Sequence, residues 1–306
     1  MQVLYLLEKI RTPWLDSIML ALTELGGETA FLVVALILFW CADKRKAYYL
    51  MSVGFIGTVS NQFLKIACQV PRPWVKDPSF TIVEAAREGA GGYSFPSGHS
   101  QTAVGTFGAI AITARKKWIR QIAIAIMIIV PITRMYLGVH TLSDVLVGSG
   151  MALCFLWILE PVCLKKDGKH LSGLFIGMAV LAVVYLAYTE LFPFPTDIDP
   201  SNLESAKKNA YTLLGTMLGM CLVYFVDENK LHFPVDGKWY AQLGKIAGGL
   251  IIVLLIKSGL KAPLEALFGG HMISRSIRYL LIVLAAGTVW PLTFPWFSKL
   301  GRKDKQ

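Results

Sequence analysis

Nine long apolar blocks restrict the folds that are open to this chain. They lie at about 28–42, 47–70, 99–114, 119–137, 142–164, 171–191, 206–226, 241–257 and 277–298. A helix needs about 20 mostly apolar residues to cross the hydrocarbon core of a bilayer. Because lipid offers no hydrogen-bond partners to the backbone, such blocks fold as helices. The sequence therefore predicts an all-α, polytopic membrane helical bundle.

The composition agrees with this interpretation. Hydrophobic residues make up 55% of the 306 residues, charged residues only 16%, and the mean hydropathy is +0.55. Soluble domains contain about 25% charged residues. The net charge of +10 comes from basic residues between the apolar blocks, and no basic stripe with interleaved aromatic residues is present. The expected partner is the lipid bilayer, and no nucleic acid is expected.

The basic residues also predict an orientation. They cluster at Lys44–Lys46, Arg115–Lys117, Lys165–Lys166 and Lys299–Lys305. If each block crosses the membrane once, all four clusters lie on one side, which the positive-inside rule makes cytoplasmic. The loops at 71–98, 138–141, 192–205 and 258–276 then face outward. Two shorter amphipathic pieces, Tyr5–Ile10 and Trp14–Leu25, are expected to lie in the membrane interface.

Three cations lie against this bias, inside or at the outer ends of apolar blocks: Lys65, Arg72 and Arg134. For any one of them, snorkelling at a helix end is the ordinary explanation. Under the proposed topology, however, they meet at one level with Pro96–His99 and with His140 and Asp144. Ionisable groups at such depth usually serve a function. Three cations beside hydroxyls, histidines and a glycine amide suit a compact polyanion, above all a phosphate.

The tetrapeptide Pro96-Ser97-Gly98-His99 reads as the start of a helix. Pro suits the first turn, Ser97 adds a hydroxyl, and Gly98 lets backbone amides approach an anion closely. Taken alone, the motif is more often an ordinary helix cap or turn.

His140 and Asp144 are four residues apart, so they are neighbours on one helical face. A carboxylate in this position keeps one ring nitrogen protonated and aims the other outward. Two histidines and one aspartate could also bind a divalent metal, but three adjacent cations would repel it. We therefore predict an anion site with no metal and no other cofactor.

These residues resemble the motifs of the phosphatidic acid phosphatase type 2 superfamily. The family carries a Lys, six residues and Arg-Pro; then Pro-Ser-Gly-His; then Ser-Arg, five residues, His, three residues and Asp. Here the same order gives Lys65–Arg72–Pro73, Pro96–His99 and Thr133–Arg134–His140–Asp144. Thr133 replaces the family's Ser; it keeps the hydroxyl but adds a methyl and a stiffer χ1, which bears on the fit of the substrate.

The resemblance implies catalytic roles for His140, His99 and Asp144. His140 would attack phosphorus and form a phosphohistidine while Asp144 holds the ring. His99 would protonate the leaving oxygen and then help to activate water. The phosphate would be held by Lys65, Arg72, Ser97, Gly98, Thr133 and Arg134. The family also implies a six-helix phosphatase core, which we place in residues 1–170; residues 171–306 would add about four transmembrane helices of unknown role.

The expected function is therefore that of an integral, metal-independent lipid phosphatase at the outer (periplasmic) face of the plasma membrane. Candidate substrates are undecaprenyl diphosphate, phosphatidylglycerophosphate, phosphatidic acid and a sphingoid-base phosphate. Short loops without Asn-x-Ser/Thr sequons favour a bacterial protein and so the undecaprenyl carrier. The alternatives are a lipid phosphotransferase and a non-enzymatic lipid-phosphate binding or transport protein. Vanadium haloperoxidases share such motifs, but they are soluble, which nine hydrophobic blocks argue against.

Overall fold

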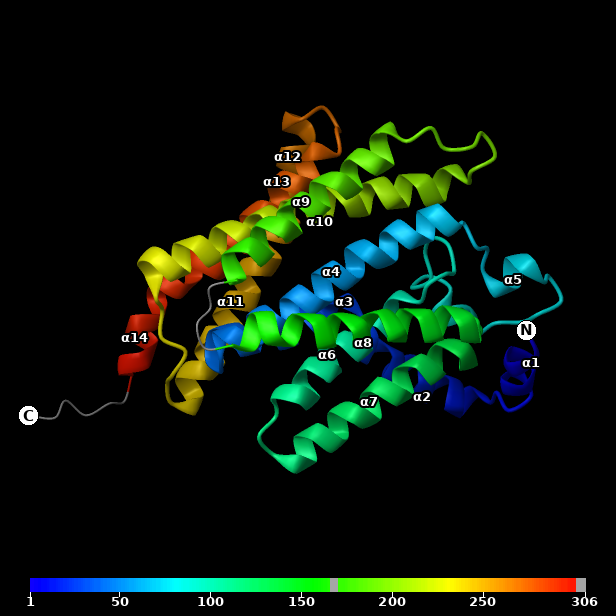
Figure 1. Cartoon of the computed structure of the whole chain (residues 1–306), viewed down its shortest axis with the longest axis horizontal. Helices are drawn as coiled ribbons and strands as arrows, with labels where there is room; N and C mark the ends of the chain where they lie inside the picture. Colours follow the sequence, from blue (N-terminus) through cyan, green and yellow to red (C-terminus); the bar gives the residue numbers. More distant parts are fainter. Residues whose placement is uncertain (166–169, 301–306) are drawn as a thin grey trace, which may run out of the picture. The chain divides into compact units, whose positions relative to one another are not determined.

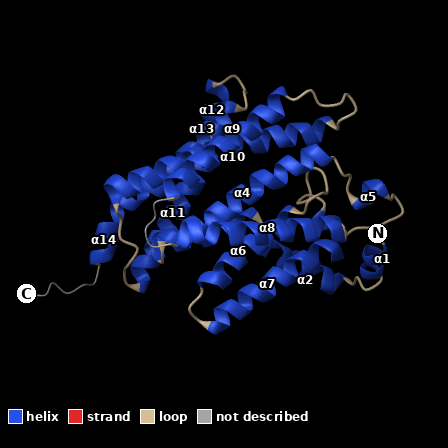
Figure 2. Cartoon of the chain, in the orientation of Figure 1, coloured by secondary structure: helices blue, strands red, loops and turns tan. Residues whose placement is uncertain are grey.

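A computed structural model of the chain describes all residues except 166–169 and 301–306, so Lys166 and the basic residues of the tail beyond 300 lie outside the described residues. Every regular element within the described residues is helical, as Figure 2 shows, which confirms the predicted all-α class. The longer elements are α1 (Gln2–Glu8), α2 (Pro13–Thr23), α3 (Glu28–Cys41), α4 (Lys44–Cys68), α6 (Gly98–Thr113), α7 (Lys117–Tyr136), α8 (Leu142–Leu164), α9 (Leu171–Leu191), α10 (Pro200–Val226), α11 (Trp239–Gly259), α12 (Lys261–Leu267), α13 (Ile273–Leu284) and α14 (Phe294–Lys299). Short helical turns complete the fold: η1 (Glu24–Gly26), α5 (Pro73–Lys76), η2 (Glu84–Ala86), η3 (Asp227–Leu231), η4 (Ala285–Val289) and η5 (Trp290–Thr293).

Each predicted apolar block lies on a helix, but the last one is not uniform. After α13, the chain passes through a π-helical turn (η4) and a 3₁₀ turn (η5) before α14 begins. Pro291 and Pro295 interrupt the regular pattern here, because proline has no N–H to donate within a helix. The expected outward loop at 258–276 also contains α12.

Six helical segments among the described residues are long and apolar enough to cross a membrane. They are Lys117–Tyr136, Leu142–Leu164, Leu171–Leu191, Pro200–Leu231, Trp239–Leu267 and Ile273–Lys299. The segments Pro13–Gly26 and Glu28–Cys41 meet the same criterion as one pair bent by 46°. The sequence predicted single crossings for α4 and α6 as well. However, α6 has only 16 residues, and the polar residues Asn61, Gln62 and Lys65 lower the hydropathy of α4.

The described chain divides into two compact units. One comprises Met1–Val34, Tyr49–Pro161 and Pro193–Ala206; the other comprises Ala35–Tyr48, Val162–Phe192 and Lys207–Gln306. In the first unit, α6 and α7 form an antiparallel hairpin (Figure 1). Their contact is built from Ala103, Phe107, Ala123 and Val130, and small residues such as the two alanines let membrane helices approach closely.

The amino-terminal residues brace the end of this unit where α7 finishes. Arg11 donates hydrogen bonds to the carbonyls of Tyr136, at 2.9 Å, and Thr81, at 2.8 Å. Buried Tyr136 packs with Leu137 and Val139 beside residues of α2. These contacts fix the turn that follows α7, and this turn carries His140.

The second unit is held by buried polar contacts of its own. Lys44 donates to both carboxylate oxygens of Asp227, at 2.7 and 2.8 Å, and its ammonium lies 3.5 Å from the centre of the Phe233 ring. Trp40 donates from Nε1 to the carbonyl of Ala286 at 2.9 Å. Because these side chains have satisfied partners, they can be buried without the full desolvation cost.

Candidate functional site

The directions of four helices place the sequence-predicted residues at one end of the first unit. Lys65 lies in the last turn of α4 and Arg134 in the last turn of α7. Ser97 is the amino-terminal cap of α6, and Asp144 lies in the first turn of α8. Two helices therefore end where two others begin, and the side chains from all four are buried.

His140 lies at the centre of this group, in the turn between α7 and α8, with 2% of its surface exposed. Its Nε2 is 2.9 Å from Nη1 of Arg72. Burial lowers the pKa of Arg72 to about 10, so the guanidinium stays charged at neutral pH and can only donate. Nε2 of His140 is therefore the unprotonated nitrogen, and Nδ1 carries the hydrogen.

Asp144 lies on the Nδ1 side of the ring, with its Oδ2 at 3.6 Å from Nδ1 of His140. The same oxygen accepts hydrogen bonds from the hydroxyl of Ser94, at 2.6 Å, and from the backbone N–H of Thr141, at 2.7 Å. The carbonyl of Asp144 accepts from the backbone N–H of Ser97 at 2.9 Å. Asp144 thus joins α8 to the 93–97 segment, and its carboxylate faces Nδ1 of His140, which has no hydrogen-bond partner among the described residues.

The environment of His140 keeps its ring neutral. Burial is the main cause that lowers the pKa of His140 well below its ordinary value, and the charges of Arg72, Lys65 and Arg134 lower it further. A neutral imidazole with an unprotonated Nε2 is the nucleophilic form of histidine, and here the Nε2 lone pair accepts the hydrogen bond from Arg72.

Arg72 and Lys65 are surrounded by backbone carbonyls. Arg72 donates to the carbonyls of Gly91 (2.7 Å), Gly92 (3.0 Å) and Val139 (2.9 Å). Lys65 donates to the carbonyls of Tyr93, at 2.6 Å, and Ser94, at 3.4 Å. No carboxylate is within ion-pair distance of either cation in the described part of the chain. Their positive charge is therefore available to an anion.

Arg134 is even more buried, with 2% of its surface exposed. Its Nη1 donates to the hydroxyl of Thr23 at 2.9 Å. Its Nε and Nη2 have no hydrogen-bond partner among the described residues. An unpaired buried N–H group lowers the stability of the folded protein. This arrangement therefore favours the binding of an acceptor such as a phosphate oxygen.

The start of α6 has the form of an anion-binding helix terminus. The hydroxyl oxygen of Ser97 accepts hydrogen bonds from the hydroxyl of Ser100, at 2.8 Å, and from the backbone N–H of Ser100, at 3.4 Å. A Cβ at Gly98 would meet only Oδ1 of Asn61, at an ordinary distance of 3.7 Å. Packing therefore does not require a glycine here, and the space beside the first amides of the helix stays open.

His99 follows in the first turn of α6 and is half-buried. It lies in the positive field of Arg134, Arg72 and Lys65, so the structure brings it to the same site. Thr133 is placed differently. Its hydroxyl donates to the carbonyl of Val130 in its own helix at 2.7 Å, so a hydrogen bond to phosphate would require this bond to be given up.

Three residues that contact the site were not found from the sequence: Ser94, Thr23 and Asn61. Ser94 stands two residues before Pro96, and Asn61 stands one helical turn before Lys65, on the same face of α4. Asn61 donates to the carbonyl of Pro96 at 3.4 Å and so holds the segment before α6. Ser94 and Asn61 could have been inferred from their spacing to Pro96 and Lys65. Nothing in the sequence links Thr23 to Arg134.

The described residues contain no group of three His, Cys, Asp or Glu side chains that could hold a metal ion. The assembled groups are instead three cations, a helix amino terminus, a neutral histidine oriented by a carboxylate, and a second histidine. Together they can bind a polyanion and present a nucleophile to it.

Comparisons with known proteins agree with this arrangement. The model of the PAP2 superfamily matches residues 45–166, which include every predicted site residue. A second model, the transmembrane extension of PAP2 superfamily phosphatases, matches residues 211–303. The phosphatidylglycerophosphatase B of Bacillus subtilis (strain 168) is 28% identical over 164 residues, which are 49% of this chain and 76% of that protein. No solved structure matches the chain.

The two family matches lie in the order that the sequence predicted, with the phosphatase domain first and additional membrane helices after it. The extension match begins within α10 and covers the apolar segments Trp239–Leu267 and Ile273–Lys299. This chain is a multi-pass membrane phosphatase that belongs to the PAP2 superfamily.

Proposed function

We propose that the protein hydrolyses a phosphomonoester or diphosphate of a membrane lipid through a phosphohistidine at the outer face of the plasma membrane. One observation carries this proposal: Nε2 of His140 is an unprotonated acceptor, Asp144 faces its Nδ1–H, and three buried cations surround the ring. A nucleophile oriented in this way within a positive site fits attack on a phosphate.

In the first step, phosphate oxygens bind to Lys65, Arg72, Arg134, Ser97 and the N–H of Gly98, with Thr133 beside them. Arg72 gives up its hydrogen bond to Nε2 of His140, and Nε2 attacks phosphorus. The bond from phosphorus to the leaving oxygen breaks, which is the ester oxygen of a phosphomonoester or the bridging oxygen of a diphosphate. Burial lowers the pKa of His99 before substrate binds; the negative charge of the bound phosphate raises it again, so His99 takes up a proton from solvent and transfers it to that oxygen. The ring of His140 becomes cationic, and Asp144 stabilises it through Nδ1–H.

In the second step, water attacks phosphorus and the bond between phosphorus and Nε2 breaks. His99, now neutral, accepts the proton of the water. Inorganic phosphate leaves, and His140 returns to its starting form. The negative charge of both transition states is balanced by the three cations, so we propose that no metal ion is needed.

The chain directions in the first unit support this location. The site lies where α6 begins, while Arg115 and Lys116 follow the other end of that helix, about 24 Å away at 1.5 Å per residue. If the basic segment is cytoplasmic, the site is on the outside. We further propose that residues 1–170 form the phosphatase core and that residues 171–306 form an additional membrane part.

For the substrate, the name of the Bacillus relative supports phosphatidylglycerophosphate, since that protein is a phosphatidylglycerophosphatase. Undecaprenyl diphosphate and phosphatidic acid carry the same reacting group. The shared chemistry of all three is a phosphate ester or diphosphate held at headgroup level on a lipid.

The test is phosphate release by the purified protein in detergent, with a chelator present, on a panel of these three lipids. Vanadate, which mimics the trigonal-bipyramidal phosphate, should inhibit the reaction. A ³²P-labelled substrate should leave an acid-labile, base-stable label on wild-type protein and none on His140→Ala. His170→Ala, at an exposed histidine, is the matched control.

Full activity of His140→Ala would refute the mechanism. Transfer of the label to a second lipid without free phosphate would identify a phosphotransferase. Tight binding of the lipids without turnover would identify a non-enzymatic binding protein.

A further inference from the structure

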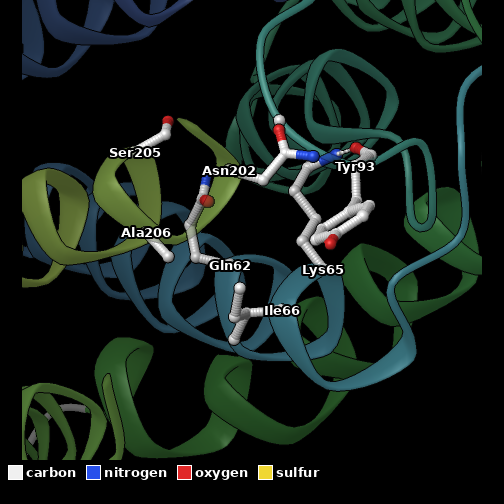
Figure 3. A pocket seen from close by; sticks show the side chains of 8 residues that line it. Gln62, Lys65, Ile66, Tyr93, Asn202, Ser205 and Ala206 are labelled. Carbon is white, nitrogen blue, oxygen red and sulfur yellow. Dashed lines mark hydrogen bonds between the residues drawn. The ribbon is translucent and has the colours of Figure 1, made fainter. Parts of the chain in front are cut away.

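A small pocket lies directly beside Lys65. Its lining comes from three parts of the first unit: the end of α4, the segment at Gly92 and Tyr93, and the first turns of α10 (Figure 3). The lining residues from α10 are Asn202, Ser205 and Ala206. The start of α10 is therefore a wall of the space next to a phosphate-site lysine.

Asn202 is the polar residue of this wall that points at Lys65. Figure 3 shows its side-chain amide directed toward the end of the Lys65 side chain. Asn202 and Ser205 are half-buried, and no hydrogen bond joins their side chains to other described residues. The backbone N–H of Asn202 donates to Oδ1 of Asp199 at 3.2 Å, which fixes the turn. The amide of Asn202 thus faces the pocket with its hydrogen-bonding capacity unused, and Ser205 lines the pocket about one turn further along α10.

The size of the pocket limits what can enter it. Its volume is about 10 Å³, which is the room that one water molecule needs. A hydroxyl group of a substrate can take the place of such a water and keep its hydrogen bonds. A second phosphate group, with its several oxygens, needs much more space, and Lys65 is the only cation in the lining.

We propose that Asn202, supported by Ser205, is a specificity-determining residue that binds a hydroxyl group of the substrate headgroup next to the phosphate held by Lys65. The inference rests on the proposed phosphatase function and narrows its substrate class to lipid phosphates with a hydroxyl-bearing headgroup. Residues 202 and 205 lie between the two family matches, at 45–166 and 211–303.

The experiment compares two lipid phosphomonoesters with identical acyl chains. Phosphatidylglycerophosphate carries one free glycerol hydroxyl next to its terminal phosphate, and phosphatidic acid does not. Asn202→Leu, which keeps the size of the side chain but not its hydrogen bonds, should lower kcat/KM for the first lipid about three- to tenfold, through KM, and leave the second within about twofold. Ser205→Ala should give a smaller change of the same kind.

Ser201→Ala is the matched control. The exposed hydroxyl of Ser201 donates to Oδ1 of Asp199 at 2.6 Å in the same turn. The variant therefore tests whether a disturbed start of α10 is enough to lower kcat/KM. Thermal unfolding identifies variants that have lost the fold, and Asn202→Ala then replaces Asn202→Leu. The proposal is overturned if both lipids lose activity equally, if neither changes, or if undecaprenyl diphosphate is the most affected substrate.

Failure of this inference can be distinguished from failure of the proposed phosphatase function. If wild-type protein hydrolyses none of the lipids, the phosphatase proposal fails, and binding is measured instead. Calorimetry with glycerol 3-phosphate and with inorganic phosphate should then show that Asn202→Leu weakens binding of the first ligand three- to tenfold and leaves the second unchanged. Equal affinities in both proteins would overturn the pocket assignment.

Discussion

Gly98 and Gly148 both lie next to the segment before α6, but for different reasons. A Cβ at Gly148 would lie 2.5 Å from the backbone carbonyl oxygen of Ser97, so α8 can approach this segment only through a glycine. A Cβ at Gly98 would meet no atom closer than 3.7 Å. We infer that Gly148 serves packing and Gly98 serves the ligand.

Gly98→Ala should therefore fold normally but lose activity. Alanine is the better residue in a helix by about 0.5–1 kcal/mol, so Tm should stay equal or rise slightly. The added methyl occupies the space through which a phosphate reaches the helix amides, and kcat/KM should fall about a hundredfold, as when one oxyanion donor is removed. Differential scanning fluorimetry and phosphate release measure the two effects.

Gly148→Ala is the contrasting variant. Its methyl meets a backbone atom that no rotamer change can move, and overpacking of this kind costs about 1–3 kcal/mol. It should lower Tm by at least about 2 °C. A Gly98→Ala protein that unfolds as readily as Gly148→Ala would contradict the assignment.

The pH dependence of stability should report on His140. Its pKa is lowered in the folded protein, while the unfolded chain binds a proton near pH 6.5. The ring therefore contributes stability that is present above about pH 6.5 and is lost as the pH falls below that value, by up to about 1.4 kcal/mol per pH unit. Between pH 6.5 and 5, Tm of the wild-type protein should fall more steeply than Tm of His140→Gln.

The control for this measurement is His170→Gln, which removes an exposed histidine and should keep the wild-type slope. Parallel curves for wild type and His140→Gln would show that the ring does not have a lowered pKa.

Among the elements, α2 contributes more to the candidate site than the sequence predicted. It was expected to lie in the interface, yet Thr23 at its end is 3% exposed and supplies the hydroxyl that Arg134 contacts. The helix thus positions one of the three cations from outside the region that the PAP2 superfamily model matches.

Thr23→Val should weaken substrate binding while the fold is kept. Valine has the shape of threonine, but it leaves Nη1 of Arg134 without its acceptor, and a hydrogen bond to a charged group contributes about 1.5–3 kcal/mol. We expect kcat/KM to fall at least about tenfold and Thr23→Ser to restore most of it. If Thr23→Ser is as impaired as Thr23→Val, the residue acts by packing and not by its hydroxyl.

The helices themselves were largely predictable because apolar blocks of this length have one stable form in lipid. The block at 142–164 coincides with α8, and that at 171–191 with α9. The early start of α10 at Pro200 was missed because its first turns are polar. The turns after α13 were missed because proline and π-helical geometry leave no mark on hydropathy.

The site was predictable to the extent that its residues interrupt apolar blocks. A lysine or arginine at membrane depth stands out, and the spacing of His140 and Asp144 places them on one face. The partners that hold these groups did not stand out. Ser94 and Thr23 are ordinary polar residues, and only the folded chain shows which carboxylate or guanidinium they contact.

For the whole molecule, the orientation in the membrane can be tested through a native cysteine. Cys68 is exposed at the end of α4, three residues after Lys65. Lys116 is exposed between α6 and α7, at the other ends of those helices. In a background without the other cysteines, a membrane-impermeant maleimide should label Cys68 in intact cells.

Lys116→Cys, introduced into the same background without Cys68, should be labelled only after the cells are made permeable. The reverse pattern would place the site on the cytoplasmic side and would contradict the orientation, since the positive-inside rule would then fail for this chain.

The carbonyl groups around Lys65 and Arg72 have a consequence for turnover. When a phosphate binds, these cations exchange backbone acceptors for phosphate oxygens, so each gains only the difference between two hydrogen bonds. When the phosphate leaves, Lys65 and Arg72 donate to these carbonyls again, so neither of these two cations is left without an acceptor. We therefore expect Lys65 and Arg72 to add little net affinity for free phosphate, the common product of every substrate considered, so that these two cations do not slow its release.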